Sequence, residues 1–549
     1  MSTLTVKGSW ENIFRQSTKA DLEAILPDFL RARRWFGGKA RRIHAVEILE
    51  AIPIHQTIGS LTAFLGLLKV EYVEGKSESY VLPIAFAGGN RASHVRDTMP
   101  QTIITRVRVN GDQEEGLLFD ALWDSSFSTA LLDAIAHGRQ FKAAHGDVIA
   151  SPTQALWQLL PSTGAPLQPA IMQAEQSNTS VVYGRRLILK LFRRMEEGVN
   201  PDLEIGRFLT ERGFAHVPPV AGSLEYHRTK GEPMTLAILQ GFVPNQGDAW
   251  RHTLDTLGCY FGRALGEQPS KDAIPSPRTS LLALSEEDLP PPAIECIGLY
   301  LDEVGLLGKR TGEMHVILAQ ETADPNFTPE PFSDVSRQIL SESMVVAADQ
   351  AFRLLRQHLT DLPEALRGEA HRVLDLEGEV RRRLRLIRDQ HITAMRIRCH
   401  GDYHLGQVLY TGKDFVIIDF EGEPARSLRE RREKGSPLRD VAGMLRSFHY
   451  AAYAALLLGK AAADRPEDFS RLEGWARFWY LWVSAAFLKA YLTEVTGAPF
   501  LPSDRQELQI LLEAHLLEKA VYELGYELNN RPDWVKIPLQ GILLLVEKG

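Results

Sequence analysis

The clearest chemical signal in the chain is a pair of aspartates, Asp402 and Asp419, each placed where an apolar β-like run meets a loop. An amide side chain, Gln407, follows Asp402 by five positions. Phosphoryl transfer depends on alignment and on charge neutralisation, so it needs one carboxylate on the nucleophile and another that holds a metal ion. The three residues therefore predict phosphoryl transfer, with Asp402 as the base and with Gln407 and Asp419 as Mg²⁺ ligands.

The same order of residues occurs in protein kinases, where a catalytic-loop Asp accepts the hydroxyl proton, an amide binds metal and a later Asp ends a β run. Gln407 is longer by one methylene than the usual Asn, and metal coordination stays open to it. His400 and His404 flank Asp402, and we expect them to order the loop rather than to bind metal. The alternative is two unrelated turn aspartates beside apolar strands.

A lysine upstream of this segment is a candidate for binding ATP. Lys190 is the basic residue of the apolar run 187–192, and Glu204 lies in a predicted helix that follows. In kinases a Lys–Glu ion pair of this kind positions the nucleotide phosphates. An edge-strand lysine and a solvated helix glutamate are the alternative.

A polar segment stands before this run, where a Gly-rich phosphate loop would be. It offers Ser177, Asn178, Thr179 and Ser180 as phosphate contacts, although it contains no glycine. Small hydroxyl and amide groups can approach phosphate, and a plain polar turn is the alternative. A second glycine-containing segment, 305–311, lacks the Walker spacing and lies in a helical pattern, so we expect only a helix there.

The elements that must position these residues change in type along the chain. Apolar periodicity predicts helices at 19–33, 116–137 and 200–212, strands at 44–52, 61–73, 78–87 and 234–243, a hairpin that turns at 183–186, and a β-rich island at 395–420. Beyond residue 247 the remaining pattern is helical, apart from a Pro-rich linker at 269–292. The sequence therefore predicts an α+β chain with a β-rich front half and a helical back half.

Composition excludes several classes of protein. The net charge of −8 argues against a nucleic-acid partner, and the three cysteines suit neither a disulfide framework nor a Cys-pair metal site. The apolar stretch 451–463 is interrupted by Lys460 and is too short to span a membrane. Because the first residues also lack the pattern of a secretion signal, we expect a cytoplasmic protein.

With these residues in view, the chain resembles the bacterial maltokinases, which are related to aminoglycoside phosphotransferases. The matching segments are 33–39, 175–180, 188–192, 198–204, 400–409, 419–424, 436–448 and 526–534. They extend over nearly the whole chain, and the block from Asp419 to Phe448 is the most specific of them. The resemblance implies a bilobal kinase-like fold and transfer of the ATP γ-phosphate to the anomeric hydroxyl of maltose, giving maltose 1-phosphate for α-glucan synthesis.

The resemblance also implies a domain layout and a partner. It predicts an N-terminal cap at residues 1–110, an ATP-binding β-rich lobe at 111–244 and a helical acceptor lobe at 245–549, with trehalose synthase as a candidate partner. Polar and aromatic residues in the helical lobe suit sugar hydroxyls and ring faces, and the candidates are Arg439, Asp440, Tyr526, Glu527 and Trp534. The alternatives are a glucosamine or aminoglycoside kinase, favoured by a strongly acidic acceptor site, and a kinase-like protein that binds trehalose synthase without catalysis.

Overall fold

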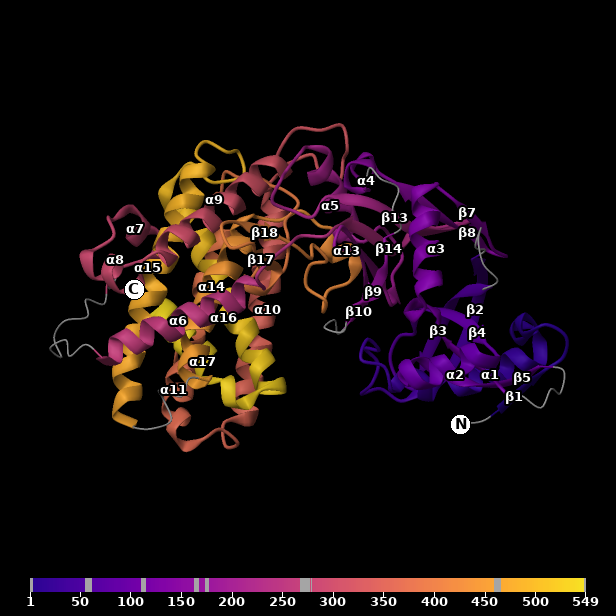
Figure 1. The fold of residues 1–549 in the computed structure, drawn as a ribbon. Coiled ribbons are helices and arrows are strands. Elements are labelled where there is room, and N and C mark those ends of the chain that lie inside the picture. Colours follow the sequence, from indigo (N-terminus) through magenta and orange to yellow (C-terminus); the bar gives the residue numbers. More distant parts are fainter. Residues whose placement is uncertain are drawn as a thin grey trace. The chain divides into compact units, whose positions relative to one another are not determined.

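The computed structural model describes residues 3–54, 62–109, 115–161, 167–172, 177–266, 277, 279–458 and 466–547. Its contacts divide the chain into two compact units. One contains Met1–Thr210 and Pro218–Pro244, and the other contains Glu211–Val217 and Asn245–Gly549. The first holds two β-sheets and the second is mainly helical (Figure 1).

The first sheet has the strand order β1-β5-β6-β4-β3-β2, and β12 also pairs with β4. Its strands are β1 (Thr3–Val6), β2 (Ile43–Ile54), β3 (Ala63–Tyr72), β4 (Glu78–Ala87), β5 (Ile103–Val109), β6 (Gly116–Asp120) and β12 (Arg194–Met195). β1 and β5 run parallel, and the other pairs are antiparallel. Helix α1 (Gln16–Arg31) packs on this sheet, and α2 (Gly89–Thr98) follows β4.

Strand β6 corrects two of our expectations. The segment 116–137 was predicted to be helical, but residues 116–120 form a fully buried strand paired with β4 and β5, and helix α3 covers only Ser125–Ala136. A short apolar run does not by its period distinguish a buried strand from a helix. The predicted cap limit at residue 110 divides this sheet, so the sheet of the cap continues to Asp120.

The second sheet has the order β7-β8-β13-β14-β11-β10-β9. Its strands are β7 (Gln140–Lys142), β8 (Gly146–Pro152), β9 (Pro169–Ile171), β10 (Asn178–Tyr183), β11 (Leu187–Phe192), β13 (Val220–Arg228) and β14 (Met234–Gly241), with helices α4 (Gln154–Leu159) and α5 (Pro201–Glu211). The predicted hairpin is confirmed by the β10–β11 register, in which Ser180 lies opposite Lys190. The helix predicted at 200–212 is confirmed as α5.

The two sheets share a hydrophobic core. Buried residues of β3 and β4, such as Leu65 and Val81, belong to the same cluster as Leu189 and Leu191 of β11. The cap sheet is therefore packed against the sheet that carries Lys190, and it forms one compact unit with it.

Helices make up most of the second unit. They are α6 (Ala249–Gly266), α7 (Leu281–Glu286), α8 (Pro291–Ile297), α9 (Tyr300–Leu318), α10 (Asp334–His358), α11 (Glu364–Asp375), α12 (Glu377–Asp389), α13 (Leu428–Arg431), α14 (Leu438–Leu458), α15 (Pro466–Glu494), α16 (Arg505–Asn530) and α17 (Lys536–Val546). Helix α14 packs against α6, α15, α16 and α17, so it forms the centre of this unit. The predicted β-rich island is confirmed as β16 (Met395–Arg396), β17 (Val408–Tyr410) and β18 (Phe415–Ile417), and β16 pairs with β15 (Glu330–Pro331).

Two glycine-containing or Pro-rich segments are also placed by the structure. Residues 305–311 lie within α9 as expected, and a Cβ at Gly308 would collide with the carbonyl of Phe487, so the glycine allows α9 to approach α15 closely. The predicted linker 269–292 is partly wrong, because it contains helix α7. Residues 269–276 and 278 of that linker lie outside the described residues.

Candidate active site

Asp402 lies in a loop that connects β16 to the β17–β18 hairpin. Gly401 has a φ of +85°, a conformation that favours glycine, and it turns the chain just before Asp402. The Asp402 side chain is 21% exposed, and its Oδ1 lies 3.5 Å from Nζ of Lys519. Oδ2 lies 3.9 Å from Nε2 of His404. The carboxylate is thus held beside two nitrogen groups and remains accessible, as a general base must be.

His400 connects this loop to the strand that precedes Asp419. Its Nε2 lies 2.9 Å from the carbonyl oxygen of Ile418, and its Nδ1 accepts the backbone N–H of Asp402 at 3.4 Å. Both bonds are satisfied by the neutral tautomer that carries its proton on Nε2. The prediction that His400 orders the loop is confirmed.

His404 makes a local contact in the same loop. Its Nδ1 accepts the backbone N–H of Gly406 at 3.0 Å, which leaves Nε2 on the side of Asp402. Loss of hydration around the ring disfavours the charged imidazolium and lowers the pKa of His404, although the negative charge of Asp402 acts to raise it.

A buried carboxylate supports the loop from helix α14. Asp440 is 1% exposed, and its oxygens accept the backbone N–H groups of His400 at 2.7 Å and of Gly401 at 2.9 Å. His315 Nε2 lies 3.2 Å from the same carboxylate, and its Nδ1 is 3.0 Å from the hydroxyl of Tyr491. Burial acts to raise the pKa of Asp440, but the bonds and charges of His315 and its neighbours outweigh it and hold the pKa below its ordinary value.

Gln407 and Asp419 are brought together by the hairpin. Val408 pairs with Ile417, and the N–H of Ile418 donates to the carbonyl oxygen of Gln407 at 3.0 Å, so the two ends of the hairpin are fixed side by side. Gln407 Nε2 lies 3.0 Å from Oδ2 of Asp419. Asp419 has a φ of +66°, which is rare for a residue other than glycine and marks a constrained position.

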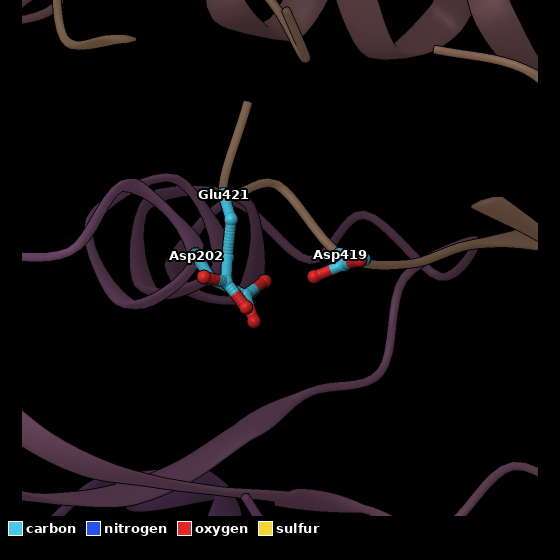
Figure 2. A group of neighbouring side chains, drawn as sticks. All are labelled: Asp202, Asp419 and Glu421. Carbon is cyan, nitrogen blue, oxygen red and sulfur yellow. The ribbon is translucent and has the colours of Figure 1, made fainter. Parts of the chain in front are cut away.

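Glu421 adds a second carboxylate on the segment after β18. Figure 2 shows Asp419 and Glu421 on this segment, and a carboxylate oxygen of one lies within 4.8 Å of one of the other. Mg²⁺ prefers oxygen ligands, and a half-turn of the Gln407 amide would present Oε1 in place of Nε2. The donors therefore fit a magnesium ion, which would be held by Gln407 and Asp419 as predicted, with Glu421 as a ligand that sequence reasoning missed.

The first unit contains the predicted ATP-binding lysine. Lys190 Nζ donates to Oδ2 of Asp202 at 3.2 Å, and Asp202 is 1% exposed in the first turn of α5. Helix α5 is capped by Asn200, whose side-chain oxygen accepts the N–H of Asp202 at 2.9 Å. Asp202 is a partner that the sequence analysis did not name. Glu204 lies half-buried in the same helix, and its pairing with Lys190 stays a prediction.

The predicted phosphate contacts lie at the start of β10. Ser177 is exposed and Asn178 is half-buried, whereas Thr179 and Ser180 are buried. The hydroxyl oxygen of Thr179 accepts a hydrogen bond from Nε of Arg193 at 2.9 Å, and the same guanidinium donates a hydrogen bond to Asp120 of β6 at 2.7 Å. This buried network joins the cap sheet to β10. Of the four predicted residues, Ser177 and Asn178 are therefore the more accessible to a phosphate group.

The predicted acceptor residues fall into two groups. Tyr526 is 45% exposed, and Arg439 and Trp534 are half-buried. Asp440 and Glu527 are each 1% exposed, and Glu527 is bound by Arg531 and Tyr450. The expectation that Asp440 and Glu527 contact the acceptor is corrected by this burial, because both carboxylates are used inside the protein.

Helix α16 carries two further groups that the sequence analysis missed, the half-buried Lys519 and the exposed Tyr522. Lys519, Tyr522 and Tyr526 follow one another at i, i+3 and i+7, so they share one face of the helix. Tyr522 is 37% exposed, and its ring centroid is 6.5 Å from that of Tyr526 in a stacked arrangement. The helical spacing of the two tyrosines could have been noticed, but no local signal connects Lys519 to Asp402, which is 117 residues away.

Comparison with known proteins agrees with this geometry. The model of the phosphotransferase enzyme family matches residues 168–479, more than half of the chain, and the chain belongs to this family. Residues 29–124 match the maltokinase N-terminal cap domain, and this match extends past the predicted limit at 110 to include β6. The family and the cap domain together identify the chain as a sugar kinase.

Relatives and solved structures support the same fold. A glucosamine kinase of Mycolicibacterium smegmatis is 23% identical over 382 residues, which are 68% of this chain and 79% of the relative. A glucosamine kinase of Streptacidiphilus jiangxiensis is 24% identical over 375 residues, which are 66% and 70% of the two chains. A solved glucosamine kinase in complex with glucosamine, ADP and inorganic phosphate has a TM-score of 0.58 at 17% identity, with 93% of this chain and 97% of that chain covered. The kinase-like α+β fold is thereby confirmed.

Within the residues that the structure describes, no helix is both long enough and apolar enough to cross a bilayer.

Proposed function

We propose that this protein is a maltokinase, which transfers the γ-phosphate of ATP to the anomeric hydroxyl of maltose with the help of Mg²⁺. The observation that carries the proposal is the maltokinase cap domain at residues 29–124 in a chain of the phosphotransferase family. The product, maltose 1-phosphate, would supply α-glucan synthesis. A cytoplasmic location and trehalose synthase as a partner belong to the same proposal.

The local geometry supports each of the proposed catalytic roles. Asp402 accepts the proton of the attacking hydroxyl, and its accessible carboxylate beside Lys519 supports that role. Gln407 and Asp419 hold Mg²⁺, which neutralises charge on the transferred phosphoryl group when it is bound. Lys190, fixed by Asp202, supplies a cation for the nucleotide phosphates, and Ser177 and Asn178 supply polar groups.

The exposed face of α16 supports a disaccharide as the acceptor. From Lys519 to Tyr526 the helix advances by seven residues, or roughly 10 Å, which is comparable to the length of two linked sugar rings. The rings of Tyr522 and Tyr526 are exposed along this distance and offer apolar faces to sugar rings. Binding energy from the second ring can then be used to align the reacting hydroxyl.

Phosphorylation of glucosamine is the second candidate, because the curated relatives carry the name glucosamine kinase. A cationic acceptor is favoured by an acidic site with carboxylates free to bind an ammonium group. The carboxylates of Glu423 and of Glu518, a residue of α16, are already paired with Arg426 and His515. This pairing favours a neutral acceptor.

A panel of acceptors tests the proposal. Turnover of ATP would be followed by coupled ADP detection with maltose, glucose, glucosamine and an aminoglycoside, each at varied concentration. We expect the kcat/KM for maltose to exceed that for every other acceptor by at least tenfold. A kcat/KM for glucosamine equal to that for maltose would reject the maltose assignment, and absence of turnover with all four would favour a non-catalytic partner of trehalose synthase.

A further inference from the structure

Lys519 is the cation placed against the proposed catalytic base. Its Nζ lies 3.5 Å from Oδ1 of Asp402, and it lies 4.9 Å from the ring centroid of Tyr522. The lysine side chain is 28% exposed, so an acceptor that reaches Asp402 also meets the ammonium group. Lys519 therefore faces the position of the acceptor hydroxyl from helix α16.

Apart from Asp402 itself, the acidic residues on and near this part of α16 are paired with basic side chains of the chain. Glu423 binds Arg426 at 2.9 Å and Arg439 at 3.2 Å, Glu518 binds His515 at 3.1 Å, Glu523 binds Arg446 at 3.0 Å, and Glu527 binds Arg531 at 2.6 Å. These four carboxylates cannot receive an additional ammonium group without giving up a partner. The cation that an incoming acceptor meets at the Asp402 carboxylate is therefore Lys519.

We propose that Lys519 is a specificity-determining residue that excludes acceptors carrying an amino group and selects neutral sugars. The inference rests on the proposed role of Asp402 as the base, and it names the acceptor class of that same site. An ammonium group has three donors and no acceptor, so Lys519 can donate to a sugar hydroxyl but can only repel another ammonium. For two unit charges about 6 Å apart at a partly solvated site, this repulsion disfavours the cation by roughly 3- to 100-fold.

The test compares glucose with glucosamine, which share one ring and differ in charge. Their kcat/KM values, or their inhibition constants against whichever acceptor is turned over fastest, give a selectivity ratio for each variant. The variants are Lys519→Met, which removes the charge, and Lys519→Arg, which keeps it. Lys489→Met is the matched control, because Lys489 is an exposed lysine of α15 in the same unit.

The wild-type protein should favour glucose over glucosamine, and Lys519→Met should reduce the ratio by roughly 3- to 100-fold. Lys519→Arg and Lys489→Met should keep the wild-type ratio. The inference is overturned if wild type prefers glucosamine, if Lys519→Met lowers both values in proportion, or if the two sugars do not differ as substrates or inhibitors. Failure of maltose to exceed glucose would reject the maltose assignment alone, because the ratio of glucose to glucosamine still reports on Lys519.

Discussion

Replacement of the buried carboxylate beneath the catalytic loop, Asp440→Asn, should slow catalysis through a loss of alignment. Asp440 accepts the backbone N–H groups of His400 and Gly401 and lies 3.2 Å from Nε2 of His315. An asparagine has one acceptor oxygen and one NH₂ group. The NH₂ group must therefore take the place of one carboxylate oxygen, where it faces a backbone N–H that is also a donor. The less costly orientation keeps the oxygen that binds His400 and gives up the bond to Gly401.

The size of the effect follows from that lost bond. A hydrogen bond to a charged group contributes about 1.5 to 3 kcal/mol. If the lost bond displaces Asp402 and the whole of this energy is added to the activation barrier, kcat falls by roughly 10- to 150-fold, because about 1.4 kcal/mol corresponds to a factor of ten. Lys190 and its partner Asp202 belong to the other unit, so the KM for ATP should change little.

Steady-state kinetics with saturating ATP and the best acceptor would measure kcat, and thermal unfolding would measure stability. Asp414→Asn is the control, because it makes the same chemical change on the β17–β18 hairpin at a partly exposed residue that pairs with Arg310. The control should keep kcat within about twofold, because the Asp414–Arg310 pair lies at the turn of the hairpin, away from the backbone N–H groups that hold the Asp402 loop. A normal kcat together with a lowered melting temperature in Asp440→Asn would refute the alignment role and leave Asp440 a purely structural residue.

Three further predictions concern the base, the metal ligand and the pH dependence of stability. Asp402→Asn should lower kcat by about 10²- to 10⁴-fold with unchanged thermal stability, and a near-normal kcat would show that another group is the base. Asp419→Ala should abolish the Mg²⁺ dependence of ATP binding measured by calorimetry, because the ion would lose a carboxylate ligand; equal ATP affinity with and without Mg²⁺ in the wild type would contradict this role. The pKa of Glu518 is lowered to about 2, because its bond to His515 and nearby arginines outweigh the opposing effect of burial. A carboxylate whose pKa is lower in the folded than in the unfolded protein stabilises the fold above the unfolded-state pKa, and this stabilisation is lost as the pH falls toward the folded-state pKa. Glu518→Gln should therefore flatten the fall in melting temperature between pH 4.5 and about 2. Identical plots of melting temperature against pH for the variant and the wild type would exclude this contribution.

The local part of the site could be predicted from the sequence. Asp402, Gln407 and Asp419 lie within one short stretch of chain, and a hairpin between apolar runs leaves few ways to arrange them. The β10–β11 hairpin was predictable for the same reason, since its turn separates two apolar runs. Spacing is informative where the residues that act together are also close in the chain.

Contacts between distant segments could not be predicted in this way. Lys519 approaches Asp402 from a helix 117 residues later, and nothing local in either segment specifies that contact. Asp440 was singled out as an acceptor contact because it is polar, whereas its burial beneath the loop depends on how α14 packs at the centre of the helical unit. Strand β6 was missed because burial on both faces removes the alternation that identifies a strand.

The most direct test of the account is the identity of the product formed from ATP and maltose. Maltose labelled with ¹³C at the anomeric carbon of its reducing ring would be incubated with the protein, ATP and Mg²⁺, and the mixture would be examined by ³¹P NMR. The account predicts a new phosphate monoester signal that is split by coupling to the labelled carbon and that forms at least about 100-fold more slowly with Asp402→Asn. A phosphate monoester signal without that coupling, or product from glucosamine in preference to maltose, would contradict the account.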